Sequence, residues 1–251
     1  MIFITGDTHG MIDWEKINTS NFPEQKNLTR DDYLIVLGDF GGVWGDPDYD
    51  RHVLKTYDKR NFTTLFIDGN HENHDLLDSY TVEEWNGGKV HLVSDNVIHL
   101  MRGQAFDIDG FRFFTMGGAE STDKAWRRKG ESWWAREMPS KEEYEEALEN
   151  LRRVGFDVDV MLTHCAPEGY IGKGMSPVYN SDLDRVVANS MPGVVDRSGN
   201  ELTGFLDSLI TERGLKFKKW FFGHYHRDME WEKFVLMYSK LRRLDEILKE
   251  G

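Results

Sequence analysis

The feature that most constrains this chain is a short apolar run that leads into glycine and polar residues, a pattern that occurs five times. The runs are residues 1–5, 33–37, 64–67, 158–162 and 220–222. Short apolar runs bounded by glycine are typical of buried strands. In open α/β sheets the carboxyl ends of strands are where ligand sites assemble. We therefore expect the polar residues after the five runs to converge on one place.

The residues after these runs have the side chains that divalent metal ions prefer, and they are Asp7, His9, Asp39, Asn70, His164, His224 and His226. A carboxylate can bridge two ions, while imidazoles and harder oxygen donors complete each ligand set. Two ions about 3.5–4 Å apart can clamp a phosphoryl group and activate water. The pattern therefore predicts a two-metal site suited to phosphate-ester hydrolysis.

Other segments indicate how the chain is organised. Residues 90–93, 97–101 and 111–116 have the pattern of short antiparallel strands. Helices are expected at residues 49–60, 140–154, 201–212 and 239–250, and residues 14–27 are weakly helical. Ser140 and Glu143 form a capping box at the start of the second helix. Without repeats or a flexible linker, residues 1–251 are expected to form one domain.

Composition narrows the class of protein. A formal charge of −13 argues against long nucleic acid as a partner, because a polyanion requires a basic surface. The apolar runs are much shorter than a bilayer span, so no membrane association is expected. The sequence has one cysteine, and its first polar motif comes too early for a signal peptide. A cytoplasmic location is therefore expected.

Taken together, the motifs resemble those of the calcineurin-like metallophosphoesterase superfamily. The matching elements are D-x-H at Asp7–His9, G-D at Gly38–Asp39, G-N-H-E at Gly69–Glu72, His164, and G-H-x-H at Gly223–His226. They occur in the order of the family and span almost the whole chain. The resemblance implies an α/β fold with two stacked mixed β-sheets flanked by helices, a four-layer sandwich.

The resemblance also implies a role for each matching residue. One metal would be bound by Asp7, His9 and His226, and the other by Asn70, His164 and His224. Asp39 would bridge the two ions. A hydroxide bound by the metals would attack phosphorus, while His71 would protonate the leaving oxygen or stabilise its charge. Mn²⁺ is the favoured ion because the superfamily often uses it, with Fe, Zn²⁺ and Ni²⁺ as alternatives.

One departure from the family pattern separates this chain from two branches. The protein-phosphatase and dinucleotide-polyphosphate branches continue the second motif as G-D-x-V-D-R-G, whereas here Gly42 and Val43 stand in place of Asp and Arg. Another group must then orient His71 and hold phosphate. Arg127 is a candidate for phosphate binding, and Trp126, Trp133 or Trp134 for stacking on a base or sugar. The alternative is that the tryptophans cap the core and the arginine is solvated or paired.

The remaining candidate residues have simpler interpretations. His52, His74, His91 and His99 are expected at the surface or in the core, and Cys165 as a small buried hydrophobe. The predicted activity is metal-dependent hydrolysis of a phosphomonoester or small phosphodiester. The alternatives are a nuclease, a protein phosphatase and a non-catalytic metal-binding scaffold.

Overall fold

The computed structural model describes residues 1–173 and 199–249. Its strands are β1 (Ile2–Thr5), β2 (Tyr33–Leu37), β3 (Thr63–Ile67), β4 (Val82–Trp85), β5 (Gly88–Ser94), β6 (Val97–Leu100), β7 (Gln104–Ile108), β8 (Phe111–Met116), β9 (Val160–Thr163), β10 (Lys219–Phe222), β11 (Met229–Trp231), β12 (Phe234–Leu236) and β13 (Leu241–Arg243). Its α-helices are α1 (Pro47–Asp58), α2 (His74–Leu77), α3 (Lys141–Arg153), α4 (Glu168–Lys173), α7 (Glu201–Thr211) and α8 (Leu244–Lys249).

These strands form two mixed sheets. The first has seven strands in the order β13-β1-β2-β3-β6-β5-β4, and the second has six in the order β11-β12-β10-β9-β8-β7. The central strands of each sheet run parallel, and antiparallel strands close both edges. The predicted antiparallel pairing is present, but it is divided between the sheets: β5 pairs with β6 in the first, and β8 pairs with β7 in the second.

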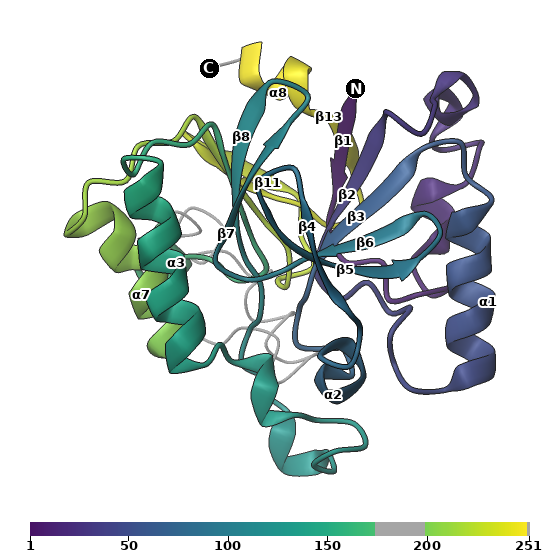
Figure 1. Cartoon of the computed structure of the whole chain (residues 1–251), viewed down its shortest axis with the longest axis horizontal. Coiled ribbons are helices and arrows are strands. Elements are labelled where there is room, and N and C mark those ends of the chain that lie inside the picture. Colours follow the sequence, from purple (N-terminus) through teal and green to yellow (C-terminus); the bar gives the residue numbers. More distant parts are fainter. Residues whose placement is uncertain (174–198, 250–251) are drawn as a thin grey trace, which may run out of the picture.

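The two sheets pack face to face because their central strands are apolar on both sides. Ile4 and Ile35 of the first sheet share a buried cluster with Leu162 and Phe221 of the second. The alternate residues of the central strands point outward and pack under helices. In Figure 1, α1 covers the outer face of the first sheet, while α3 and α7 cover that of the second. This arrangement confirms the predicted α/β sandwich of two mixed sheets between helical layers.

Local signals place the long helices close to where they were predicted. Ser140 and Glu143 form the predicted capping box: Ser140 Oγ accepts from the Glu143 amide at 3.2 Å, and Glu143 Oε2 accepts from the Ser140 amide at 2.6 Å. Helix α1 begins two residues before the predicted position because Asp46 caps it and Pro47 fits the first turn. Helix α7 also lies within its predicted range.

The C-terminal segment was predicted less well. Residues 239–250 were expected to be one helix, but β13 lies near the start of that segment and only α8 is helical. Strand β13 pairs antiparallel with β1, with Thr5 opposite Leu241. This pairing satisfies the backbone N–H and C=O groups at the edge of β1. The stabilisation that it gives outweighs the weak helical pattern of residues 241–243. Residues 14–27 form two 3-10 helices, Trp14–Ile17 and Pro23–Asn27.

Cys165 is buried in the core under α7, as expected of a small hydrophobe. Across residues 1–173 and 199–249, the helices are either too short or too polar to span a lipid bilayer.

Candidate metal centre

Five strand ends from the two sheets supply the predicted site residues. Asp7, Asp39 and Asn70 follow β1, β2 and β3, which are adjacent and parallel in the first sheet. His164 follows β9 directly, and His224 and His226 follow β10, its parallel neighbour in the second sheet. Parallel neighbours end at the same edge of a sheet, so each sheet gathers its polar residues at one edge. Packing of the two sheets then brings these edges together.

The backbone of these loops is unusual. His9, Asp39, His224 and His226 all have positive φ, at 43°, 49°, 69° and 50°. Such conformations are uncommon for residues with a Cβ, and they cost of the order of 1 kcal/mol or more each. Their concentration in the site loops indicates that tertiary contacts hold these side chains in specific directions.

The glycines of the motifs allow the ligand-type side chains to approach the strands closely. A Cβ on Gly38 would lie 2.2 Å from His164 Nδ1, and one on Gly223 would lie 2.3 Å from Asp7 Oδ1. Neither position therefore has room for a side chain. These glycines are required because the polar residues of other motifs pack directly against them.

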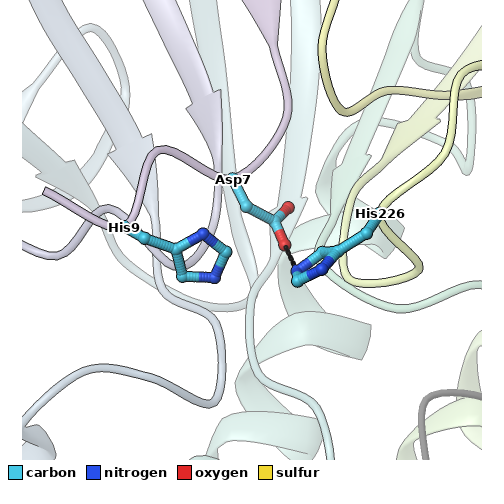
Figure 2. A group of neighbouring side chains, drawn as sticks. All are labelled: Asp7, His9 and His226. Carbon is cyan, nitrogen blue, oxygen red and sulfur yellow. Dashed lines mark ion pairs between the residues drawn. The ribbon is translucent and has the colours of Figure 1, made fainter. Parts of the chain in front are cut away.

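The first cluster consists of Asp7, His9 and His226, whose ligand atoms all lie within 4.8 Å of one another. Figure 2 shows their side chains converging, with the ion pair of Asp7 and His226 marked by a dashed line. Asp7 is fully buried, and its Oδ1 accepts from the His224 amide at 3.0 Å. Its Oδ2 lies 3.1 Å from His226 Nε2 and makes no hydrogen bond to the described residues. A buried carboxylate oxygen of this kind is suited to bind a cation.

The second cluster consists of Asp7, Asp39 and His164. Asp39 Oδ2 lies 3.5 Å from His9 Nε2 and 3.4 Å from His164 Nε2. One oxygen of this carboxylate is therefore placed between a histidine of each cluster. This is the position that a bridging ligand requires.

Asn70 and His224 lie beside the second cluster. Asn70 Oδ1 is 3.3 Å from His164 Nε2. The ring of His224 is 5.0 Å from that of His164, measured between centroids, but His224 does not belong to either cluster. The structure thus gathers all seven predicted ligands in one region, with His224 slightly apart.

The electrostatics of the site favour bound positive charge. Burial alone would lower the pKa of His9, but Asp39, Asp7 and Asp13 outweigh it and raise that pKa to about 9. In the same way Asp39 and Asp7 raise the pKa of His164 to about 10 despite its burial. The negative potential that retains a proton on these rings would also attract a divalent cation. The donors are imidazoles, carboxylates and an amide, which fits Mn²⁺, Fe, Zn²⁺ or Ni²⁺.

Further residues, which the sequence motifs did not single out, orient the histidines. His9 Nδ1 is 2.7 Å from Asp13 Oδ2, and Tyr238 donates to the other oxygen of Asp13 at 3.1 Å. His164 Nδ1 donates to the carbonyl oxygen of Leu37 at 2.6 Å. Each contact leaves Nε2 facing the centre of the site, as is usual around metal-binding histidines. The only local signal for Asp13 was its position four residues after His9.

Glu72, the last residue of the third motif, connects two of the site loops. Its Oε1 accepts from the Phe40 amide and its Oε2 from the Gly69 amide, each at 2.6 Å. The side chain is fully buried. Burial, with Asp39 and Asp68 nearby, raises its pKa to about 8. Glu72 therefore fixes the loop after β2 to the loop after β3, and so fixes Asp39 relative to Asn70.

His71 contacts both the metal-ligand cluster and the segment that follows β8. Its amide donates to Asp39 Oδ1 at 2.8 Å. Its ring nitrogens Nδ1 and Nε2 lie 3.0 Å and 3.3 Å from the two terminal nitrogens of Arg127. Arg127 is itself held by Asp123 Oδ1 at 2.6 Å and by the Ser132 carbonyl at 3.1 Å. Arg127 is thus paired with an acid, as one interpretation of the sequence expected, yet it also reaches His71.

The tryptophans of this segment have different environments. Trp134 is buried, and its Nε1 donates to Asp75 Oδ2 at 3.0 Å. It therefore packs in the interior, as the alternative interpretation expected. Trp126 is 91% exposed, and Trp133 is half-buried. Because it is buried, Trp134 is not available to stack on a substrate.

The other histidines lie where the sequence analysis expected them. His52 is exposed on α1, whereas His74, His91 and His99 are buried. His99 Nε2 lies 3.2 Å from Asp68 Oδ1, and its Nδ1 lies 3.1 Å from His91 Nδ1. This buried polar group is structural and separate from the two clusters.

His74 should make the protein sensitive to acid. Burial, with a contribution from Arg102, lowers its pKa to about 3. The unfolded chain has an ordinary histidine pKa, so it binds more protons than the native state below about pH 6.5, and the free energy of unfolding falls as pH falls. Between pH 7 and pH 5, the free energy of unfolding should therefore fall by about 2 kcal/mol less in His74→Gln than in the wild type. Urea unfolding at both pH values would measure this difference.

The control is the exposed His52, whose replacement by glutamine should leave the pH dependence of unfolding as in the wild type. If His74→Gln kept the full acid sensitivity of the wild type, His74 would not be the residue responsible.

A crystal structure of a Staphylococcus aureus protein, provisionally named a 5'-nucleotidase and solved with α-ketoglutarate, is 14% identical with a TM-score of 0.45. The match covers 94% of this chain but 48% of that protein, so this chain spans about half of its length. No curated protein matches the sequence.

Comparison with family models gave a direct result. The model described as calcineurin-like phosphoesterase matches residues 1–228, which include all five strand-end motifs. Members of this family hydrolyse phosphoester bonds with divalent metal ions, which is the class of enzyme that the motifs predict. The chain belongs to the calcineurin-like phosphoesterase family.

Proposed function

We propose that this protein is a two-metal phosphoesterase that hydrolyses a phosphomonoester or a small phosphodiester. The observation that carries the proposal is the position of Asp39, whose Oδ2 lies between His9 Nε2 and His164 Nε2. A carboxylate oxygen placed between two histidines from different sheets is suited to bridge two ions. Since both sheets contribute to this centre and to one core, we also propose that residues 1–251 form one domain.

The ligand sets are those that the family resemblance implies, and the two clusters support them in part. Asp7, His9 and His226 would hold one ion and Asn70, His164 and His224 the other, with Asp39 shared. Two bound ions would neutralise the phosphoryl oxygens and lower the pKa of water. Mn²⁺ is the ion we favour, with Fe, Zn²⁺ or Ni²⁺ as alternatives for the same donors.

Two residues outside the ligand set would act on the substrate. His71 would donate a proton to the leaving alcohol as the P–O ester bond breaks and a water oxygen bonds to phosphorus. The proton that this water releases would restore His71 after the alcohol departs. Arg127 lies against the His71 ring and can offer its fork of N–H groups to two phosphoryl oxygens. It would take the place of the arginine that the second motif lacks.

The charge distribution favours a small substrate. Against a net charge of −13, cationic side chains gather at Lys124, Arg127, Arg128 and Lys129, on the segment that reaches His71. Three of these cations pair with acids of the same segment: Lys124 with Glu120, Arg127 with Asp123 and Arg128 with Glu131. So small a net positive charge suits a single phosphate group rather than a long polyanion. We also keep a cytoplasmic location as a prediction, which rests on the single cysteine.

Metal removal tests the function directly. Metal-stripped protein should not hydrolyse p-nitrophenyl phosphate or bis-p-nitrophenyl phosphate, and added Mn²⁺ should restore turnover of one of them. The faster substrate distinguishes a monoesterase from a diesterase. Absence of turnover with two ions bound would favour a binding scaffold. Cleavage of plasmid or single-stranded DNA would favour a nuclease, and release of phosphate from phosphopeptides would favour a protein phosphatase.

Replacing Arg127 with alanine should raise KM and lower kcat/KM by about 10- to 100-fold, since a charge-assisted phosphate contact contributes about 1.5–3 kcal/mol. Metal content should not change. The matched control is Arg128→Ala, because that side chain is 82% exposed and pairs only weakly with Glu131 at 3.5 Å. Steady-state kinetics with unchanged kcat and KM for Arg127→Ala would exclude the phosphate-binding role.

A further inference from the structure

Asn70 is held from behind by a chain of two buried polar residues. Its Nδ2 donates to Ser121 Oγ at 3.1 Å. Ser121 Oγ donates in turn to Glu137 Oε2 at 2.7 Å, and the Ser121 amide donates to Glu137 Oε1 at 2.9 Å. Ser121 and Glu137 are each 1% exposed and Asn70 is 5% exposed, so solvent does not compete for these groups.

The chemistry of this chain fixes which way the amide of Asn70 points. A carboxylate only accepts hydrogen bonds, and a serine hydroxyl has a single hydrogen. Because that hydrogen is given to Glu137, Ser121 Oγ can only accept from Asn70. The amide NH₂ of Asn70 must therefore face Ser121, and Oδ1 must face the opposite side.

The opposite side is the second cluster. His164 Nδ1 faces the carbonyl oxygen of Leu37, which can only accept, so Nδ1 carries a hydrogen and Nε2 is the nitrogen able to bind metal. Asn70 Oδ1 lies 3.3 Å from that nitrogen. In the metal-free protein a proton on Nε2 can be shared with Oδ1. In the neutral, metal-binding form of the ring both atoms are acceptors, and a shared cation can satisfy both.

We propose that Ser121 and Glu137 are positioning residues that hold the amide oxygen of Asn70 toward the second metal. This inference rests on the proposed two-metal function. Neither residue belongs to a strand-end motif; both lie in the segment between β8 and α3 that also carries Arg127. One segment thus orients a metal ligand through Ser121 and contacts the ring of His71 through Arg127.

The fold holds Glu137 firmly enough for this role. Its carbonyl oxygen accepts from Arg102 Nη2 at 3.2 Å, and Arg102 Nε donates to the buried Asp68 at 2.8 Å. Gly118 packs on the same carbonyl, where a Cβ would lie 2.4 Å away. The acceptor at the end of the chain is therefore tied to Asp68, which lies just after β3 and two residues before Asn70.

Two variants test the inference with Mn²⁺ alone as the probe. Ser121→Ala removes the acceptor for the Asn70 amide. In Glu137→Gln the side-chain oxygen of the new glutamine must accept from the Ser121 backbone amide, so the glutamine NH₂ group donates to Ser121 Oγ. The hydroxyl hydrogen of Ser121 then turns toward Asn70. This favours the flipped side-chain amide of Asn70, with its NH₂ group toward the metal. In both variants the second Mn²⁺ should bind about 10- to 100-fold more weakly, while the first is unchanged.

Equilibrium dialysis with metal analysis gives the two affinities, and electron paramagnetic resonance distinguishes a coupled Mn²⁺ pair from a single ion. Glu131→Gln is the matched control, because Glu131 lies on the same segment with its side chain 67% exposed. Selective loss of the second ion, with an unchanged Tm of the metal-free protein, supports the proposal. Equal binding of both ions in variant and wild type, or parallel loss of both, overturns it. A wild-type chain that binds fewer than two Mn²⁺ contradicts the two-metal function itself, and the inference falls with it.

Discussion

Replacing Asp39 with asparagine should lower the rate of phosphoester hydrolysis by about 10³-fold or more and weaken binding of both metals. Asp39 Oδ2 lies 3.5 Å from His9 Nε2 and 3.4 Å from His164 Nε2, so it belongs to both halves of the centre. An amide has nearly the same shape but lacks the negative charge that would hold two cations together. The measurements are metal content per chain and kcat/KM with p-nitrophenyl phosphate.

The same substitution also weakens the link to His71, whose amide donates to Asp39 Oδ1. Asp107→Asn is a suitable control, because this aspartate lies on β7 with its side chain 68% exposed. It should have wild-type metal content and activity. If Asp39→Asn retained two metals with full affinity, another residue would have to bridge them and the assigned geometry would be wrong.

Replacing His71 with asparagine should lower kcat by about 10²- to 10⁴-fold while leaving metal content intact. His71 belongs to neither cluster of ligand-type atoms, although its ring lies 5.9 Å from that of His9, measured between centroids. Its connection to Asp39 is made by the backbone amide, which the substitution retains. The loss should be smaller for substrates with better leaving groups, because a good leaving group needs less protonation. Comparing p-nitrophenyl phosphate with phenyl phosphate measures this dependence.

His52→Asn controls for loss of an imidazole elsewhere, since His52 is exposed on α1. The two variants should therefore differ in what they lose. Asp39→Asn should have both a lower metal content and a lower rate of hydrolysis, whereas His71→Asn should have a lower rate with unchanged metal content. Full activity in His71→Asn would remove this residue from the mechanism. Loss of metal in His71→Asn would show instead that it contributes to the metal centre.

Local sequence patterns were sufficient for the strands that position the site and for the helices with strong caps. The five apolar runs became β1, β2, β3, β9 and β10 within about two residues at each end, because buried strands have unbroken apolar sequences. Strand β7 was missed because its sequence, Gln104–Ile108, mixes polar and apolar residues. Strand β13 was mistaken for part of a helix because pairing with β1, far away in the sequence, decides its conformation.

The sequence by itself determined the family and which residues gather at the strand ends, because both depend on local pattern and on the order of motifs, which the sequence displays directly. The two-sheet sandwich was implied by the resemblance to that family. The tertiary structure alone decided what supports those residues: Arg127 contacts His71 across 56 residues, and Ser121 contacts Asn70 across 51. No periodicity encodes such contacts, because they depend on the path of the segment after β8 and on the packing of two sheets. Loop path and sheet packing result from the whole fold, so they could be read only from the folded chain.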